Sequence, residues 1–429
     1  MNRFYIWTIG CQMNKADSER LASNLENIGY RQVERAEEAD TIVLNSCSVR
    51  QSAEDKVINK LSNLKALKRK RPDVTLALTG CMVNSNLEGL KERYPHVDFF
   101  LKPQKLDDLL AYAEEQTSQD EPEDTPVQVQ SPTAYVPIIH GCNNFCSFCI
   151  VPYRRGREKS RPMTEIIAEI ESLSDRGVKE VTLLGQNVDS YGNDLSDRPD
   201  LSDLLQELNQ IDGLARIRFL TSHPKDMSQK LIDTIASLDK VCEHISLPAQ
   251  SGDNEILKAM RRGYTIEQYC ELISRIRYAI PDVALSNDII VGFPNESSDQ
   301  FQRTFDFLEE YKFDTVHVAV YSPRPGTIAS RKMEDNIPST EKQDRLRKIE
   351  ELQERISIDK TSRLVGQTVE VLVEGRKGNK WQSRTRSDKL VFFSHDESCL
   401  GKLLQVKIDH AGPWSLQGTP VTSDNLCTK

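Results

Sequence analysis

The sequence predicts an α/β protein with three parts: a parallel-sheet α/β domain, a partial (β/α)6 barrel and a small all-β domain. Three observations lead to this prediction. Short apolar runs alternate with helix-like stretches up to about residue 111, the alternation restarts at residue 134, and residues from 364 onward alternate apolar with polar positions. Alternating strands and helices are typical of parallel sheets covered by helices, and period-two alternation is typical of half-buried strands.

The first predicted domain covers residues 1–113. Its strand candidates are 4–7, 41–44 and 75–78, and helix-like segments such as 18–28 and 53–68 lie between them. Residues 114–133 are rich in Glu, Asp, Gln, Pro and Ser, which indicates an acidic flexible linker.

The second predicted domain covers residues 134–363. Six strand candidates alternate with helices, and a charged helix over 340–364 closes the domain. Because ligands bind at the carboxyl ends of the strands in β/α barrels, we expect the chemistry there. The strands are 134–140, 179–184, 215–220, 242–247, 284–291 and 314–321, and the helices are 163–176, 200–211, 227–239, 265–279 and 298–311.

The third predicted domain, 364–429, has Gly-rich turns between alternating segments and reads as a small barrel or sandwich. No apolar run approaches the roughly 20 residues that span a bilayer, and the N-terminus lacks the features of a signal peptide. The sequence therefore predicts a cytoplasmic protein, which we expect to be a monomer. Cytosolic thiols stay reduced, so the ten cysteines favour metal binding or catalysis over disulfides.

Three central cysteines carry the strongest signal. Cys142, Cys146 and Cys149 lie within eight residues, just beyond a predicted strand. A [4Fe–4S] cluster normally takes four thiolates, so three would leave one iron open for chemistry. The alternatives are a zinc site completed by His140 and chance clustering. The Cys-x3-Cys-x2-Cys spacing after the first strand of a β/α series is similar to the signature of radical S-adenosylmethionine enzymes.

The N-terminal cysteines Cys11, Cys47 and Cys81 are widely spaced, but each follows an apolar strand and a small residue. The carboxyl ends of parallel strands share one edge of a sheet. We therefore expect these cysteines to converge there and hold a second open [4Fe–4S] cluster; the alternative is three unrelated buried cysteines. Cys242, Cys270, Cys399 and Cys427 lack partners at metal-ligand spacing and read as core or surface thiols.

Both cysteine sets, in this order, resemble the methylthiotransferases of the radical S-adenosylmethionine superfamily, most closely the MiaB type, the tRNA-2-methylthio-N6-dimethylallyladenosine synthases. The resemblance spans nearly the whole chain and implies a C-terminal TRAM domain that binds RNA. Sister groups act on threonylcarbamoyl-adenosine in tRNA or on ribosomal protein S12, and usually lack Gln-Met-Asn after the first cysteine. The matching residues are Gly10-Cys11-Gln12-Met13-Asn14, Cys47-Ser48-Val49-Arg50, Cys149-Ile150-Val151-Pro152-Tyr153, Arg155-Gly156-Arg157-Glu158, Leu183-Leu184-Gly185-Gln186-Asn187, Leu247-Pro248-Ala249-Gln250-Ser251 and Lys389-Leu390-Val391-Phe392-Phe393.

The resemblance implies that a methylthio group is placed on C2 of N6-dimethylallyladenosine at position 37, in the anticodon loop of tRNA. The implied cofactors are two [4Fe–4S] clusters and S-adenosylmethionine; the implied partners are an electron donor of the flavodoxin or ferredoxin type and a sulfur donor. No protein acid or base is assigned. A rival from another class is a non-catalytic RNA-binding protein with zinc-stabilised domains.

Candidate contacts to S-adenosylmethionine lie at the ends of, or within, the barrel strands. The resemblance adds Phe148, beside the adenine. For each of the others, as for His223, a structural loop hydrogen bond is the alternative. The candidates taken from strand positions are Gln186, Asn187, Ser222, Gln250, Ser251 and Asp288.

Two basic stretches are candidates for RNA contact. Arg154, Arg155 and Arg157 follow the central cysteines, and their alternative is a solvated face. In the last domain, the candidates are Arg384, Arg386 and Lys389, for which the local sequence offers only Asp388 as a counter-charge. Aromatic side chains near basic ones suit RNA binding, but Phe392 and Phe393 alternate faces, so one of them belongs to the core.

Overall fold

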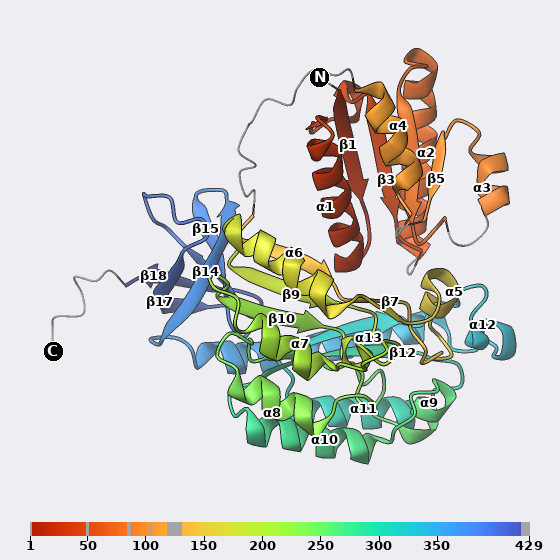
Figure 1. Cartoon of the computed structure of the whole chain (residues 1–429). Coiled ribbons are helices and arrows are strands. Elements are labelled where there is room, and N and C mark those ends of the chain that lie inside the picture. Colours follow the sequence, from red (N-terminus) through yellow and green to blue (C-terminus); the bar gives the residue numbers. More distant parts are fainter. Residues whose placement is uncertain (1, 49–50, 84–86, 103–104, 118–130, 422–429) are drawn as a thin grey trace. The chain divides into compact units, whose positions relative to one another are not determined.

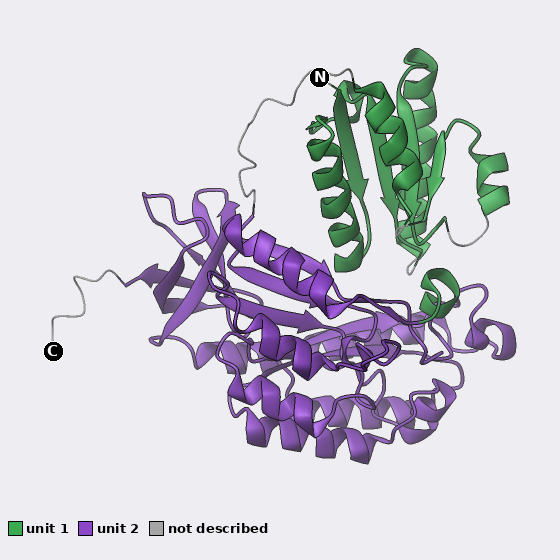
Figure 2. Ribbon diagram, in the orientation of Figure 1, with its two compact units in different colours: residues 1–127, 150–157 green, residues 128–149, 158–429 purple. Residues whose placement is uncertain are grey.

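The computed structural model describes residues 2–48, 51–83, 87–102, 105–117 and 131–421. The chain divides into two compact units (Figure 2): residues 1–127 with 150–157, and residues 128–149 with 158–429. Both are α/β, and the second carries an additional closed β-barrel, so the predicted fold class is confirmed. No helix in the described ranges is long and apolar enough to cross a membrane.

The first unit is built on a parallel sheet of order β2-β1-β3-β4-β5 (Figure 1). Ile42 and Leu44 of β3 pack with residues of α2, while Val43 packs with residues of α1 and α4. Burial on both faces explains why the central strands are continuously apolar. The elements are β1 (Arg3–Thr8), α1 (Gln12–Asn27), β2 (Arg31–Gln32), η1 (Ala36–Glu38), β3 (Thr41–Ser46), α2 (Gln51–Lys70), β4 (Thr75–Gly80), α3 (Leu87–Arg93), β5 (Phe99–Leu101), α4 (Asp107–Gln116) and α5 (Val151–Arg155).

The predicted linker starts too early. Helix α4 continues to Gln116, and Leu109 and Ala113 are its buried residues. Glu114 and Glu115 are exposed residues of this helix, so their charge does not mark a linker. At the other end, β6 already begins at Thr133. Residues 118–130 lie outside the described ranges.

The second unit contains the six predicted barrel strands, now β6 (Thr133–Pro137), β9 (Glu180–Leu184), β10 (Arg216–Leu220), β11 (His244–Ser246), β12 (Ala284–Val291) and β13 (Thr315–Val320). They pair in parallel as β6-β9-β10 and β11-β12-β13, and the bridge between Ile217 and Val241 joins the two sets. The strands therefore form the expected partial (β/α)6 barrel. The predicted strand 134–140 is split, because β6 ends at Pro137 and β7 (Ile139–His140) pairs with β8 (Lys159–Ser160) instead.

The helices of this unit agree with the predicted ones, and 298–311 matches α11 residue for residue. Helices α9 and α12 and the short η2 were not anticipated, because segments of three to six residues carry little periodicity. The helices are α6 (Met163–Asp175), η2 (Val188–Ser190), α7 (Leu201–Leu208), α8 (Gln229–Ser237), α9 (Asn254–Ala259), α10 (Ile266–Ala279), α11 (Ser298–Tyr311), α12 (Ile328–Lys332) and α13 (Ser339–Ser362).

The C-terminal strands close into a barrel of order β14-β15-β16-β18-β17. Its core includes Val371, Trp381 and Phe393, whereas Phe392 is half-buried, as the alternation predicts. The sequence left barrel and sandwich open, and the structure decides for the barrel. The strands are β14 (Thr368–Lys377), β15 (Lys380–Thr385), β16 (Leu390–Phe393), β17 (Leu403–Ala411) and β18 (Leu416–Pro420).

Candidate cluster sites and the strand ends

The central cysteines lie in one loop that follows β7. Cys146 is buried, whereas Cys142 and Cys149 are partly exposed. The backbone N–H of Cys149 donates to the carbonyl of Cys146 at 3.0 Å, which makes a tight turn between these two ligand candidates. The backbone N–H and side-chain amide of Asn143 both donate to the carboxylate of Glu158 at 3.0 Å, so the loop is anchored at its base.

The loop is also seated on the end of α9. Ser147 donates its hydroxyl to the carbonyl of Ala259 at 2.7 Å and its backbone N–H to the carbonyl of Met260 at 2.9 Å. Nη1 of Arg262 lies 3.3 Å from Sγ of Cys146. Burial raises the pKa of the Cys142 thiol, and Glu158 and Cys146 add to this, while the Arg262 charge opposes it. Sequence reasoning missed Arg262, because nothing in its local motif connects it with the cysteines.

Buried polar atoms without hydrogen-bond partners gather at the ends of β9 and β10 and in the cysteine loop. They are Oε1 of Gln186, Oδ1 of Asn187, Nε2 of His223 and Nδ2 of Asn144. A bond from Lys225 Nζ to Asn144 Oδ1 at 3.0 Å links the loop to the segment after β10. Leaving such groups buried and unpaired is costly, so their grouping indicates a place where a polar ligand supplies the missing bonds. The amino, carboxylate and ribose groups of S-adenosylmethionine offer both donors and acceptors.

The other predicted cofactor contacts have protein partners. Ser222 donates its hydroxyl to Asp189 at 2.8 Å, and Ser251 lies 3.3 Å from the hydroxyl of Thr304. The main chain of Gln250 bridges to Ile289 of β12, and Asp288 pairs across to His317 of β13. For Ser222 and Ser251, the alternative of a structural hydrogen bond is what the structure contains. Phe148 is partly buried and packs against a cluster that contains Phe293 and Tyr321.

Burial shifts the pKa values of His223 and Asp189, at this end of the barrel, in opposite directions. Burial lowers the pKa of His223 to about 2, helped by the charges of Arg262 and Lys225. Burial raises the pKa of Asp189 to about 7, against the hydrogen bonds from Ser222 and the His223 backbone. His223 is therefore neutral at pH 7, and because Nδ1 accepts from the Lys225 backbone at 3.3 Å, Nε2 carries the proton.

The N-terminal cysteines follow three neighbouring parallel strands. Cys11 follows β1, Cys47 follows β3 and Cys81 follows β4, and the pairings Thr8 with Asn45 and Ser46 with Gly80 bring these ends to one edge. The small residues before the cysteines have a packing reason. A Cβ on Gly10 would lie 2.8 Å from Cβ of Cys47, and one on Gly80 would lie 2.2 Å from the carbonyl of Ser46.

Asn14 and Arg155 lie among these cysteines. The buried amide of Asn14 donates to the carbonyls of Ile9 and Ser46 at 2.8 and 2.9 Å. Its Oδ1 accepts from Arg155 Nη2 at 2.8 Å and is 3.8 Å from the sulfur of Cys11. Asn14, the last residue of the Gln-Met-Asn motif, thus holds two strand ends together beside the first cysteine.

Arg155, a predicted RNA contact, lies among the N-terminal cysteines. Its side chain is only 3% exposed; Nε lies 3.3 Å from Sγ of Cys81, and Nη2 lies 3.7 Å from Asp17. Burial raises the pKa of Asp17 to about 6, against the attraction of Arg155 and Arg20. Of the other two predicted contacts in this stretch, Arg154 is half-buried and Arg157 is exposed.

Whether these cysteine sets fit clusters can be judged from their chemistry. Among the described residues, no group of three or more His, Cys, Asp or Glu side chains is placed to hold a single metal ion. This holds for both cysteine sets as well as for the zinc alternative with His140, so the chemistry of the donor sets has to distinguish between them. Thiolate-only sets with a neighbouring guanidinium suit an anionic iron–sulfur cluster, whose ligands are soft thiolates and whose charge is balanced by nearby cations.

The three predicted basic contacts of the last domain all form ion pairs. Arg386 bonds Glu243 at 2.6 to 3.1 Å, and Lys389 bonds Asp314 at 3.0 Å. Arg384 pairs with Glu374 at 3.1 Å as well as with Asp388 at 3.2 Å. Within the basic stretch Asp388 is the counter-charge, as predicted, and the folded structure adds Glu243, Asp314 and Glu374 from outside it. The RNA contact of these three residues stays a prediction, and the structure shows the ion pairs that their side chains form in its absence.

The exposed basic side chains of the small barrel lie elsewhere. Lys377 and Lys380 are exposed, cross-strand neighbours. Nζ of Lys377 lies 6.0 Å from the ring centroid of the half-buried Phe392. Lys380 donates to the side chain of Gln417 at 2.6 Å on the adjacent part of the barrel. These residues form the lysine face (Lys377, Lys380 and Phe392), a cationic surface with an aromatic ring.

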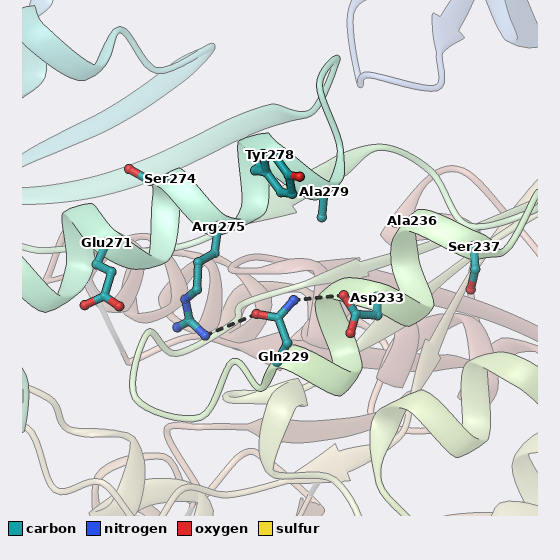
Figure 3. A pocket seen from close by; sticks show the side chains of 9 residues that line it. All are labelled: Gln229, Asp233, Ala236, Ser237, Glu271, Ser274, Arg275, Tyr278 and Ala279. Carbon is teal, nitrogen blue, oxygen red and sulfur yellow. Dashed lines mark hydrogen bonds between the residues drawn. The ribbon is translucent and has the colours of Figure 1, made fainter.

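A surface groove lies between α8 and α10 (Figure 3). Gln229 bridges its two sides, since it accepts from Arg275 at 3.3 Å and donates to Asp233 at 2.8 Å. Tyr278, at its margin, is 91% exposed. None of the residues that line this groove is a predicted site residue.

Three family profiles together match most of the chain. Residues 3–102 match the uncharacterized protein family UPF0004, residues 136–308 match the radical SAM superfamily, and residues 362–421 match the TRAM domain.

Solved structures show the same fold. A radical S-adenosylmethionine methyltransferase, TsrM from Kitasatospora setae, has a TM-score of 0.55 at 14% identity over 77% of this chain and 75% of that one. The cobalamin-dependent S-adenosylmethionine radical enzyme OxsB has a TM-score of 0.52 at 13% identity over 82% of this chain and 56% of that one.

Curated relatives are similar over nearly the full length. A tRNA-2-methylthio-N(6)-dimethylallyladenosine synthase of Dehalococcoides mccartyi is 51% identical over 97% of this chain and 98% of its own length. Proteins of the same name from Chloroflexus aurantiacus and Roseiflexus sp. are 48% and 50% identical, covering 99% and 98% of this chain and 92% and 90% of their own lengths. The chain belongs to the radical S-adenosylmethionine family of tRNA-2-methylthio-N(6)-dimethylallyladenosine synthases.

Proposed function

We propose that this chain methylthiolates C2 of N6-dimethylallyladenosine at position 37 of tRNA. The observation that carries the proposal is the pair of cysteine triplets in a chain 51% identical to a synthase of that name over nearly its full length. One triplet follows three neighbouring parallel strands, and the other lies in the loop after β7. The Gln-Met-Asn motif supports the same substrate class.

Two [4Fe–4S] clusters and S-adenosylmethionine are the proposed cofactors. A cluster on Cys142, Cys146 and Cys149 would supply the electron that cleaves S-adenosylmethionine, and one on Cys11, Cys47 and Cys81 would hold the sulfur to be transferred. The proposal includes a flavodoxin- or ferredoxin-type electron donor, a sulfur donor and action as a cytoplasmic monomer.

The protein groups bind and orient. Gln186 and Asn187 offer buried carbonyl oxygens to an ammonium or hydroxyl donor, and His223 offers a buried N–H to a carboxylate or a ring nitrogen. Ser147 seats the cysteine loop on α9. The buried walls of the barrel exclude water from reactive species.

The function is tested by mass spectrometry of tRNA nucleosides. Cells that lack this protein are expected to lose 2-methylthio-N6-dimethylallyladenosine and to accumulate N6-dimethylallyladenosine. Re-expression should restore the product. Loss of a threonylcarbamoyl-adenosine derivative instead, or an unmethylthiolated ribosomal protein S12 with normal tRNA, would assign the chain to a sister activity.

The lysine face is the proposed tRNA contact of the small barrel. Replacing Lys377 and Lys380 together by Ala is expected to weaken tRNA binding and to reduce the slope of log K against log salt, by about 0.7 to 0.9 for each phosphate that the variant no longer neutralises. Fluorescence anisotropy with labelled tRNA over a salt series measures both quantities.

Arg386→Ala is the matched control, because its charge is already paired with Glu243. It should leave the salt slope unchanged. A slope that changes in Arg386→Ala but not in the double lysine variant would return the RNA contact to the residues predicted from sequence.

A further inference from the structure

A buried arginine holds the central cysteine loop from the side of α9. Arg262 donates from Nη1 to Sγ of Cys146 at 3.3 Å, from Nη2 to the carbonyl of Pro248 at 2.7 Å and from Nε to the hydroxyl of Tyr264 at 3.0 Å. Its residue exposure is only 5%. Each arm of the guanidinium therefore has a different partner, which leaves its orientation little freedom.

The backbone conformation after α9 places the Arg262 side chain against the cysteine loop. Gly263 has φ +76° and Arg261 has φ +59°, so the backbone turns sharply on both sides of Arg262. The Arg262 backbone N–H is bonded to the carbonyl of Leu257 at 3.0 Å. Since Ala259 and Met260 accept from Ser147, one short segment, 259–262, contacts the cysteine loop through a hydroxyl, a backbone N–H and a sulfur.

Arg262 also reaches the loop that follows β11. The hydroxyl of Tyr264 donates to the carbonyl of Ala249 at 2.8 Å, and Arg262 itself bonds the neighbouring Pro248. This loop continues into Gln250, which has φ +79° and is a predicted contact for S-adenosylmethionine. The guanidinium thus joins the cysteine loop to a strand-end loop of the proposed cofactor site.

The buried positive charge of Arg262 requires a neighbouring negative charge for stability. Among the described residues, no carboxylate lies within ion-pair distance of it; its partners are a sulfur, a carbonyl and a phenol. A buried cation without a counter-charge would be strongly destabilising. The anionic cluster that Cys146 would bind is a counter-charge for this position, because Arg262 Nη1 lies 3.3 Å from the Cys146 sulfur.

We propose that Arg262 is a positioning residue of the radical-forming centre: its guanidinium orients the Cys146 thiolate and raises the reduction potential of the cluster bound there. This inference rests on the proposed function, which places a cluster on the central cysteines. A positive charge and an N–H···S hydrogen bond stabilise the reduced, more negative state of a cluster more than the oxidised state.

The test is an EPR-monitored dithionite titration of reconstituted protein in which Cys11, Cys47 and Cys81 are Ala, so that only the central cluster is observed. Arg262→Gln keeps side-chain N–H donors but removes the charge, and it is expected to lower the potential. Arg262→Lys keeps the charge and should lie closer to the parent protein. Arg261→Gln is the matched control, since Arg261 is the exposed neighbour, and its potential should not change.

An unchanged potential in Arg262→Gln with full iron content would overturn the inference. If Arg262→Gln retains no iron, the lysine variant decides. Recovery of the cluster by Arg262→Lys supports the role of charge, and a folded lysine variant that also binds no iron would refute it. A parent protein without any iron–sulfur signal would instead reject the proposed function.

Discussion

Alanine at Cys142, Cys146 and Cys149 together is expected to abolish reductive cleavage of S-adenosylmethionine and with it all methylthiolation. These cysteines share one loop and are the proposed ligands of the central cluster, so the triple variant lacks all three of its thiolates. Anaerobically reconstituted protein should contain about eight irons per chain in its original form and about four in the triple variant. Iron analysis and chromatographic detection of 5′-deoxyadenosine measure the two effects.

Cys270→Ala is the control for this experiment. Cys270 is half-buried on α10 and belongs to neither cysteine triplet. It should retain iron and activity. A triple variant that still cleaves S-adenosylmethionine, or a colourless original protein that contains zinc, would contradict the assignment of the radical-forming centre.

Alanine at Cys11, Cys47 and Cys81 is expected to have a different result, with sulfur insertion lost and S-adenosylmethionine cleavage retained. The physical reason is that these cysteines belong to a separate sheet edge, next to Arg155 rather than Arg262. The measurement compares 5′-deoxyadenosine with the methylthiolated nucleoside in the same reaction.

The iron content of this second variant should again fall to about four per chain. Loss of cleavage together with sulfur insertion, in a protein that remains folded by circular dichroism, would mean that the two cysteine sets do not divide the chemistry. Asn14→Ala is an informative companion: it keeps all cysteines but removes the bonds to Ile9 and Ser46, so partial loss of iron is expected.

Much of the fold could be predicted because the local pattern of apolar residues indicates which side chains are buried. The strands 41–44 and 75–78 are apolar throughout, since helices cover both faces of the sheet, and the barrel strands follow the same rule. Helix α4 was misjudged because its acidic residues lie on an exposed face, while only Leu109 and Ala113 report burial. Strand pairing could be inferred as parallel, but the order β2-β1-β3-β4-β5 could not.

The basic residues show where prediction from sequence failed. Arg386 bonds Glu243, which is 143 positions away in the sequence, and Arg155 contacts Cys81, which is 74 positions away. A run of charged residues predicts solvent exposure unless oppositely charged residues lie nearby in the sequence. The partners of Arg386 and Arg155 are far away in the sequence, so their ion pairs and hydrogen bonds could not be predicted. Arg262 had no signal at all, since its contact with Cys146 spans 116 positions.

Two features could be predicted from the sequence alone: the two sets of three cysteines and the β/α alternation that places strands before them. The spacing of the cysteines and the periodicity of apolar residues depend only on residues close together in the sequence, so both can be recognised without the fold. Which charged groups lie beside those cysteines became visible only in the folded structure. Arg155 and Arg262 reach Cys81 and Cys146 because the folded sheet and barrel bring distant segments within hydrogen-bond distance, and no pattern in the neighbouring residues encodes that approach.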